Sequence, residues 1–345
     1  MKTLKKFMAA MLALSVVLAL TACGGSSSGS SGSSEPSGNG GSGGSDEPAP
    51  EHYHIGISQY GEHASLDNCR IGFLQGLEEA GLVEGENLTV DYQNAGFDDS
   101  IATQIGQTFS AGNVALMVGI ATPSAVACFA AAEDKDIPVI FTAITDPVGA
   151  KLDSGNITGT SDVLPVEGQL QLIRDLQPNA KNVGIVYTTS EANSVYSIGV
   201  YEEKAPDYGL TIETVGVTSQ AEVTQAVDTL ISRGVDCISN LTDNTVVGVL
   251  PAILEKTNEA GVPVYGSEIE QMKLGCVAGA GLDYIKLGIQ TGQMAAKVLK
   301  GEATCQDLPY EVIENYDLYI NSEALDAMGL SVPAKVADAA IEANG

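Results

Sequence analysis

Six short polar runs in the sequence contain the side chains that are best suited to contact a small molecule. Each run follows a stretch with the composition of a β-strand, and each holds hydroxyl, amide or carboxylate groups. The candidate ligand-binding residues are Gln59, Tyr60, His63, Thr122, Ser124, Thr145, Asp146, Tyr187, Asn193, Ser194, Asp243, Asn244 and Glu268. Any one of these polar residues could simply cap a helix. Six runs together favour a polar binding site.

The balance of these groups indicates a ligand with two opposite charges. The hydroxyls of Thr122, Ser124 and Thr145, together with free N–H groups at helix starts, suit a carboxylate. The carboxylates that suit an ammonium group are Asp146, Asp243 and Glu268. An α-amino acid carries both groups, so we predict an amino-acid-like ligand.

Sequence signatures of enzymes are missing. The chain has no phosphate-binding loop, no dinucleotide-binding glycine pattern after a strand, and no nucleophile elbow. We therefore expect no catalytic residue, no cofactor and no metal site. A Ser–His–Asp site that uses His63 stays open as an alternative, and turnover of a bound ligand would revive it.

Charge and cysteine content exclude further classes of protein. The chain has 44 acidic and 16 basic residues, which gives a formal net charge of −28. Such a charge repels phosphate groups, so we expect no nucleic-acid partner. Cys69, Cys128, Cys237, Cys276 and Cys305 are widely spread and odd in number, so we expect small buried hydrophobic residues and no disulfide framework.

The polar runs need strands and helices to position them. Beyond residue 51 the chain alternates β-branched runs with amphipathic stretches, a pattern typical of βαβ units and a mostly parallel sheet. Strands are expected at 53–58, 88–92, 115–120, 139–142, 182–187, 210–215, 235–240, 262–265 and 277–282, and within 311–320. A helix from about Leu66 is expected to bury Ile71, Leu74 and Leu77, and others are expected at 191–208, 221–233, 249–260 and 284–299. The pattern predicts two Rossmann-like doubly wound α/β lobes with a ligand cleft at the carboxyl ends of their strands.

The first 50 residues are expected to lie outside these lobes. Lys2, Lys5 and Lys6 precede a short apolar run, which predicts a signal peptide over residues 1–22. The sequence that ends at Cys23 resembles the bacterial lipobox, in which this cysteine is lipidated. Nineteen of the 27 residues from 24 to 50 are Gly or Ser, so residues 23–50 are predicted to be a lipidated, flexible tether. We expect an exported protein on the extracytoplasmic face of the cell membrane, held there by the lipid anchor alone.

Several stretches carry a resemblance to a known family. They are ISQYGEH at 57–63, ATPSA at 121–125, FTAITDPVGA at 141–150, NITGTSD at 156–162, EANS at 191–194, TDNT at 242–245 and DY at 283–284. In this order and spacing they resemble the tryptophan/tyrosine-type solute-binding lipoproteins of bacterial ABC importers. The sequence departs from that pattern with Ala64 and Ser65, where a Pro often follows the His, and with Tyr60, where Phe is frequent.

The resemblance implies a type I periplasmic-binding-protein fold, in which two lobes are joined by three crossings of the chain. The crossings are expected near 156–162, 280–283 and 315–321, and the helix after Asp283 is expected to pack on the first lobe. The expected first lobe is 51–158 plus 283–316, and the second is 159–282 plus 317–345.

The function that the resemblance implies is ligand capture for an ABC importer. A monomer would bind an amino-acid-like ligand between its lobes, with aromatic amino acids among the candidates, and would deliver it to the permease and its ATPase. The alternatives are a nucleoside- or sugar-binding lipoprotein of the same fold, and a ligand sensor for a membrane kinase.

Overall fold

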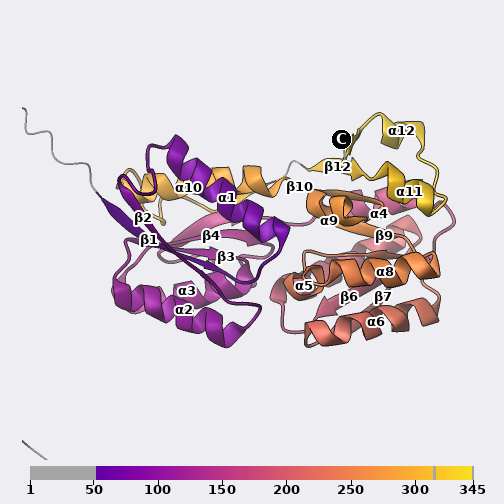
Figure 1. Ribbon diagram of the computed structural model, residues 1–345, viewed down its shortest axis with the longest axis horizontal. Coiled ribbons are helices and arrows are strands. Elements are labelled where there is room, and N and C mark those ends of the chain that lie inside the picture. Colours follow the sequence, from indigo (N-terminus) through magenta and orange to yellow (C-terminus); the bar gives the residue numbers. More distant parts are fainter. Residues whose placement is uncertain (1–51, 314–315, 344–345) are drawn as a thin grey trace, which may run out of the picture. The chain divides into compact units, whose positions relative to one another are not determined.

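A computed structural model describes residues 52–313 and 316–343 (Figure 1). The predicted signal peptide, Cys23 and the predicted tether lie outside the described residues. In the described ranges, no helix combines the length and the apolar character needed to cross a lipid bilayer. The predicted α/β fold with two mostly parallel sheets is confirmed, and we call each sheet with its helices a lobe.

The first sheet has six strands, all parallel, in the order β11-β5-β4-β3-β1-β2. Its strands are β1 (Tyr53–Gln59), β2 (Leu88–Asn94), β3 (Leu116–Ile120), β4 (Val139–Ile144), β5 (Ile157–Ser161) and β11 (Glu311–Val312). Strand β5 was not predicted because its Thr and Gly residues lack a β-strand pattern of apolar residues. The structure instead buries Thr158 and Thr160, whose hydroxyls bond Leu308 O and Thr291 Oγ1 at 2.7 Å each.

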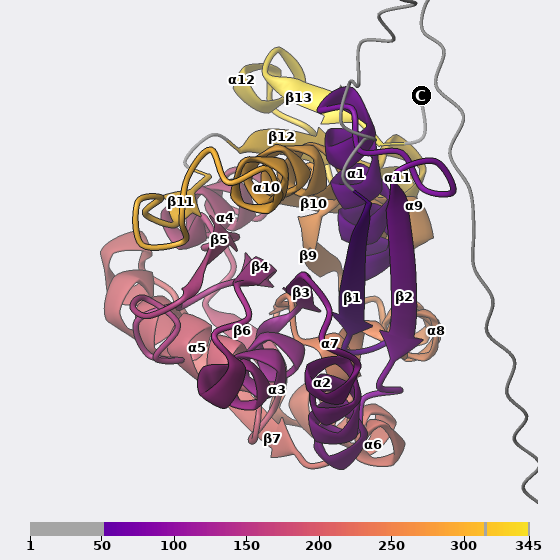
Figure 2. The same ribbon diagram turned by 90° about the vertical axis from the view of Figure 1, so that its left-hand side faces the viewer.

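Four helices cover the first sheet, two on each face (Figure 2). They are α1 (Ala64–Glu79) and α10 (Tyr284–Leu299) on one face, and α2 (Asp99–Gly112) and α3 (Thr122–Ala132) on the other. The packing of α10 against α1 confirms that the helix after Asp283 returns to the first lobe. A Cβ atom at Gly288 of α10 would lie 2.3 Å from Cys69 O of α1, so the two backbones touch only because glycines face each other.

The buried face of α1 differs from the prediction. Ile71 is 49% exposed, although the spacing of apolar residues placed it in the core. The face that meets α10 uses Gly72 and Gly76, and the neighbouring Phe73 and Leu77 are fully buried. Leu77 is buried as predicted, but apolar periodicity missed the contact with α10 because its contact residues are glycines.

The second sheet has seven strands in the order β13-β12-β10-β9-β8-β6-β7. They are β6 (Asn182–Thr188), β7 (Thr211–Val217), β8 (Cys237–Ser239), β9 (Val264–Glu268), β10 (Ala278–Leu282), β12 (Asp317–Ile320) and β13 (Ala340–Glu342). All neighbouring pairs are parallel except β10 and β12. The parallel strands therefore end at one common edge, which carries the polar runs.

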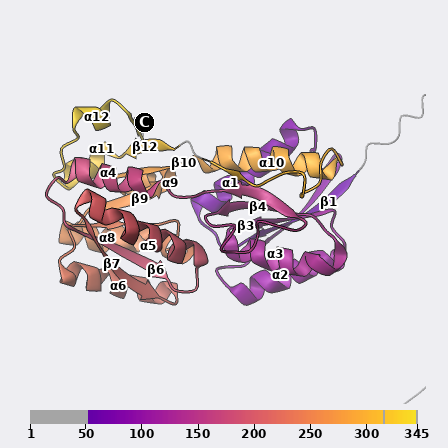
Figure 3. The ribbon, with the colours of Figure 1, turned by 180° about the vertical axis from the view of Figure 1, so that it is seen from behind.

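Helices cover both faces of the second sheet as well. One face carries α4 (Val166–Leu176) and α5 (Ala192–Lys204), which are seen in front in Figure 3. The other face carries α6 (Gln220–Arg233), α8 (Leu250–Ala260) and α9 (Ile269–Leu274). Of these, α6 and α8 are in front in Figure 1. Short helices α7 (Asn244–Val247), α11 (Ser322–Ala327) and α12 (Ala334–Ala337) complete the lobe. The helix predicted at 191–208 stops at Lys204, and the 3-10 turn Ala205–Tyr208 follows because Pro206 lacks the N–H that an α-helix needs.

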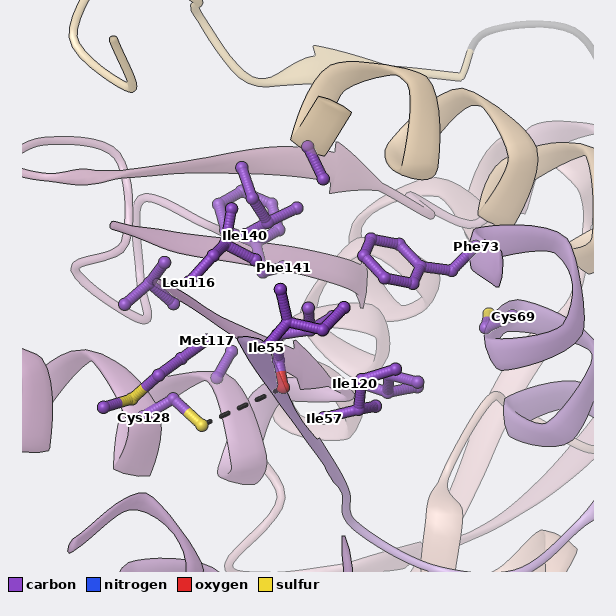
Figure 4. Close-up of a cluster of buried hydrophobic side chains, with 14 of the residues drawn as sticks. Ile55, Ile57, Cys69, Phe73, Leu116, Met117, Ile120, Cys128, Ile140 and Phe141 are labelled. Carbon is purple, nitrogen blue, oxygen red and sulfur yellow. Dashed lines mark hydrogen bonds between the residues drawn. The ribbon is translucent and has the colours of Figure 1, made fainter. Parts of the chain in front are cut away.

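The core of the first lobe is built from β-branched and aromatic side chains of the central strands and α1 (Figure 4). Cys69 and Cys128 are buried in this core, and Cys128 Sγ donates to Val118 O at 3.9 Å. In the described part of the chain the five cysteines are all buried, as predicted, and are free thiols. Burial raises the pKa of the Cys128 thiol to about 12, so this thiol stays neutral.

Three connections join the two sheets, and they follow β5, β10 and β11. The sequence placed the end of the first lobe at residue 158, but β5 pairs with β4 of the first sheet through Ser161. The first crossing therefore begins at Asp162. This shift of three residues puts an acidic side chain at the crossing, next to the carboxyl edges of both sheets.

Candidate functional site

One enclosed cavity lies between the polar edges of the two lobes. The residues of the first lobe and the crossings that line it are His63, Ser65, Leu66, Ala143, Thr145, Asp162 and Tyr284. The second lobe contributes Asn193, Thr242, Asn244, Val247, Glu268 and Gln271. We call this space the central cavity. Its free volume is about 10 Å³, which is room for about one water molecule, so the two lobes must move apart to admit a larger ligand.

Three buried polar atoms on the wall of the central cavity are available to a ligand. Among the described residues, His63 Nδ1, Asn193 Oδ1 and Glu268 Oε1 have no hydrogen-bond partner. A buried polar atom without a partner costs about 1–3 kcal/mol, so a ligand or an ordered water is expected to satisfy it.

All three atoms are hydrogen-bond acceptors. Asn193 Nδ2 donates to Thr242 O at 3.2 Å, which assigns Oδ1 as the other amide atom. Burial lowers the pKa of His63 to about 4, so its ring is neutral. With His63 Nε2 3.4 Å from Asn244 Oδ1, the proton lies on Nε2, and Nδ1 accepts. We call His63 Nδ1, Asn193 Oδ1 and Glu268 Oε1 the cavity acceptors.

Two buried carboxyl groups make the central cavity acidic. Asp162 accepts hydrogen bonds from Thr145 Oγ1 at 3.0 Å and from the Tyr284 hydroxyl at 2.7 Å, and burial raises its pKa. Burial also raises the pKa of Glu268, to about 7, while Glu268 Oε2 accepts from the N–H of Glu270. Within the described part of the chain, no Lys or Arg lines this cavity. The cavity therefore favours a cationic group.

Direct contacts hold the two lobes together around the central cavity. Asn68 of α1 donates a hydrogen bond of 3.0 Å to Glu270 of α9. His63 and Asn244 form a second bridge. The first lobe therefore meets the second lobe at α7 and α9, which flank the cavity.

Asp243 was predicted to hold a ligand ammonium, and the structure gives it a different role. Its oxygens accept from Thr188 N and Oγ1 at 2.6 and 2.8 Å, from Ser194 Oγ at 2.7 Å and from Val246 N at 2.9 Å. Asp243 thus caps α7 and fastens it to β6, and Ser194 is occupied by the same carboxylate. Both residues lie outside the lining of the central cavity because these bonds turn them into the second lobe.

Glu191 has a similar supporting role. Oε1 accepts from Thr245 N and Oγ1, and Oε2 accepts from Asn244 N and Nδ2, all at 2.8–2.9 Å. Burial, with the nearby charge of Asp243, raises the pKa of this carboxyl. Glu191 therefore orients Asn244, whose amide oxygen faces His63.

Four further predicted residues also lie outside the central cavity. Gln59 bonds Gly61 O and Asp67, and Ser124 accepts from Ser58 Oγ at 3.1 Å. Asp146 accepts from Gly149 N at 2.9 Å and so closes a turn. Tyr187 packs on the apolar core of the second lobe. These side chains support the loops around the site.

Tyr60 and Thr122 line a second, more open cavity. Its wall combines α2 and α3 with residues 190–191 and the first residue of α5. The Tyr60 hydroxyl donates to Asp99 Oδ1 at 2.9 Å. Of the predicted residues, the central cavity brings together His63, Thr145, Asn193, Asn244 and Glu268.

Sequence reasoning missed several residues of the central cavity. Asp162 and Tyr284 lie at two crossings, within stretches that carry the family resemblance. Their position could therefore have identified them as site residues. Ala143 has a φ of 58° and Ala121 has a φ of 74°, which are left-handed values that favour glycine. A glycine would have indicated a turn at these positions, whereas an alanine does not. The bends near the ends of β3 and β4 at the site were therefore not predictable.

A metal centre is not supported. In residues 52–313 and 316–343, His, Cys, Asp and Glu side chains do not gather in a group of three or more that could hold a metal ion. The acidic groups of the central cavity bond to hydroxyls and backbone N–H groups instead.

Known proteins with this sequence pattern are transporter components. The pattern of the family described as ABC transporter substrate binding protein matches residues 54–344. A relative named tyrosine-binding protein, from Clostridioides difficile (strain R20291), is 36% identical over 282 residues, which is 80% of this chain and 81% of the relative.

Two solved structures are similar over nearly their whole length. A domain from Streptococcus pneumonia in complex with L-Trp is 34% identical with a TM-score of 0.81, and the match covers 85% of this chain and 99% of that one. The ligand-free, open structure of a substrate binding protein with adhesive properties from Clostridium difficile is 35% identical with a TM-score of 0.63, over 84% and 99% of the chains. At nearly equal identity, the fold of this chain matches the L-Trp complex more closely than it matches the ligand-free, open structure.

These similarities agree with the fold and with the site. The expected type I periplasmic-binding-protein fold is confirmed. The family consists of extracytoplasmic solute-binding proteins, and its members are not enzymes. The chain belongs to the family of ABC transporter substrate-binding proteins.

Proposed function

We propose that this protein captures an amino acid in the central cavity and delivers it to an ABC permease. The observation that carries the proposal is the set of three cavity acceptors in an acidic space enclosed by both lobes. An ammonium group has three N–H donors and one positive charge. It would satisfy the cavity acceptors and balance the charge of Glu268.

The ligand class is narrowed by the rest of the cavity wall. Leu66, Ala143 and Val247 supply apolar surface, and Tyr284 supplies an aromatic ring. A relative is named for tyrosine and a similar structure contains L-Trp, which supports an aromatic amino acid. Closure of both lobes on the ligand would then shift the population toward the closed form.

Titration calorimetry with the twenty protein amino acids tests the ligand class. We expect L-Tyr or L-Trp to bind most tightly. The matched control is the same molecule without its amino group, 3-(4-hydroxyphenyl)propionate or indole-3-propionate, which we expect to bind at least about tenfold more weakly because the cavity acceptors stay unsatisfied. Equal binding of both members of a pair would contradict the proposed ammonium site.

We further propose that Cys23 is lipidated after removal of residues 1–22, so that residues 23–50 tether the lobes to the membrane. The motif at the end of the signal sequence and the Gly and Ser content support this arrangement. Cys23→Ser should release the protein from the membrane fraction, and mass spectrometry should detect diacylglycerol on the wild-type cysteine. Neighbouring genes for a permease and an ATPase would favour an importer, and a histidine kinase gene would favour a sensor.

A further inference from the structure

Phe97 occupies an unusual backbone conformation beside the site. It lies in the loop between β2 and α2, and its φ of 64° is in the left-handed region that favours glycine. Such a conformation is strained at a bulky residue and persists only where the surroundings enforce it. Here Phe97 N donates to Tyr60 O at 2.8 Å, and the Tyr60 hydroxyl lies 3.3 Å from Phe97 O. The structure therefore holds this side chain in a fixed direction.

The Phe97 ring packs between two other aromatic rings of the first lobe. It meets Tyr60 edge-on, with centroids 6.0 Å apart and planes at 88°, and it stacks on His63 at 6.4 Å and 6°. We call these three side chains the aromatic cluster. A Cβ atom at Gly61 would lie 2.0 Å from Phe97 Cε1, so only glycine at that position admits the ring.

The aromatic cluster faces the second lobe at α7. His63 Nε2 lies 3.4 Å from Asn244 Oδ1 at the start of α7. At the other end of that helix, a Cβ atom on Gly248 would lie 3.3 Å from Phe97 Cζ. The ring edge of Phe97 therefore reaches the backbone of Gly248 in the second lobe. Both ends of α7 are in contact with the cluster.

We propose that Phe97 is a positioning residue for ligand capture, which holds His63 against Asn244 and seats the first lobe on Gly248. The inference deepens the proposed function, because it rests on capture of the amino acid in the central cavity. Phe97 itself lies outside the lining of that cavity, whereas His63 supplies one of the cavity acceptors. Phe97 would therefore act on affinity through His63 and through lobe closure.

Closure of the lobes removes water from the aromatic cluster, and this is the physical basis of the proposed effect on affinity. When the lobes separate, the edge of Phe97 and the ring of His63 lose their contacts with α7 and become hydrated. Removing apolar surface from water favours the closed form. A ligand that binds only the closed form gains affinity in proportion to the closed population.

A purely structural role for Phe97 is the competing explanation, since its ring also packs on the core of the first lobe. Phe97→Gly separates the two roles, because glycine accepts a φ of 64° and the substitution relieves backbone strain while it removes the ring. The control is Phe129→Ala. Phe129 is a half-buried ring packed on the same core, at the end of α3 beside Gly155.

Two measurements decide between these roles. In calorimetry, we expect Phe97→Gly to weaken binding of the best amino acid roughly threefold to tenfold, and Phe129→Ala to leave the Kd unchanged. In NMR titrations of the amino-acid complexes, in which the lobes are closed, we expect a His63 pKa of about 4 in the wild type and a value nearer the ordinary 6.5 in Phe97→Gly only. Burial sets the low wild-type pKa, against the opposing effects of the Asn244 hydrogen bond and of the charge on Asp67.

The outcomes for the two proposals are distinguishable. Wild-type affinity together with a wild-type His63 pKa in Phe97→Gly would overturn the role of Phe97 and leave the proposed function intact. If the wild-type protein binds none of the amino acids, the proposed function fails. The positioning role rests on that capture, so it fails as well in this case.

Discussion

The hydroxyl group of Tyr284 donates a hydrogen bond of 2.7 Å to Asp162 Oδ2. Asp162 begins the first crossing after β5, and Tyr284 begins α10 after the second crossing. The bond therefore ties two of the three crossings together at the wall of the central cavity. Thr145 satisfies the other oxygen of Asp162. Burial raises the pKa of Asp162, and the hydrogen bonds from these two hydroxyls oppose that rise.

Tyr284→Phe should destabilise the protein in a pH-dependent way. The change removes one donor from a buried carboxylate, and we expect the free energy of unfolding to fall by about 1–3 kcal/mol at pH 8. The loss should shrink as the pH is lowered, since protonation of Asp162, whose pKa is raised, removes the charge that needs the donor. Urea unfolding over a series of pH values measures this trend. Tyr92→Phe, at an exposed tyrosine on β2, is the control and should change little.

Glu268→Gln should weaken ligand binding without loss of stability. Replacement of the buried carboxylate leaves the ligand ammonium without its charged partner, which costs about 1.5–3 kcal/mol, or about tenfold to a hundredfold in Kd. The melting temperature of the ligand-free protein should stay the same or rise, because a buried charge is removed. Glu255→Gln, on the exposed side of α8, serves as the matched control. Unchanged affinity in Glu268→Gln would mean that the ammonium is bound elsewhere.

Affinity for the amino acid should fall as the pH is lowered from about 8 to 5.5. Burial raises the pKa of Glu268 from its ordinary 4.5 to about 7, so below pH 7 an ammonium ligand must displace a proton from this carboxyl. Protonation of His63 also lowers the affinity below pH 6.5. Burial lowers the pKa of His63 when the lobes close, so closure must release a proton from a charged ring.

The ligand-free protein should show the opposite trend for Glu268. A carboxyl with a raised pKa contributes stability that is fully present below 4.5 and is lost as the pH rises through about 7. Calorimetric Kd values and melting temperatures across this range check both trends. A Glu268→Gln variant with the same pH slope as the wild type would exclude Glu268 as the titrating group.

Gly288→Ala should separate α10 from α1. A Cβ atom there would lie 2.3 Å from Cys69 O, a backbone atom that cannot move alone, and overpacking of this kind costs about 1–3 kcal/mol. Gly199→Ala is the control within α5, where, among described atoms, a new Cβ atom meets nothing within 4 Å. The control should be neutral or stabilising by about 0.5–1 kcal/mol, because alanine favours the helix. Thermal unfolding of the two variants makes the comparison.

The architecture was predictable because local signals and long-range packing agree. The sequence predicted α10 from 284 to 299, and the helix spans Tyr284–Leu299, with Asp283 as an N-cap that accepts from Ile285 N. Gly301, just beyond its end, has the positive φ that such a position favours. Strand ends were placed well enough to bring Thr145 and Asn193 to the same cavity.

The roles of individual carboxylates were not predictable in the same way. Asp243 and Glu268 both follow strands of the second sheet, and both are N-caps. Asp243 accepts hydrogen bonds from Thr188 and Ser194, which belong to other segments of the chain. Glu268, in contrast, has one oxygen that can still accept a hydrogen bond in the central cavity. This difference depends on neighbours that are distant in the sequence. The residues of one short polar run carry no information about those neighbours.

The return of α10 to the first lobe also fixes the order in which the molecule can assemble during synthesis. Strands β1 to β5 are made early, yet the face of β4 and β5 that α10 covers stays bare until almost all of the second lobe has been translated. A ribosome that stalls before Tyr284 would leave a chain with an uncovered apolar sheet. Such a truncated product is a ready substrate for chaperones and proteases.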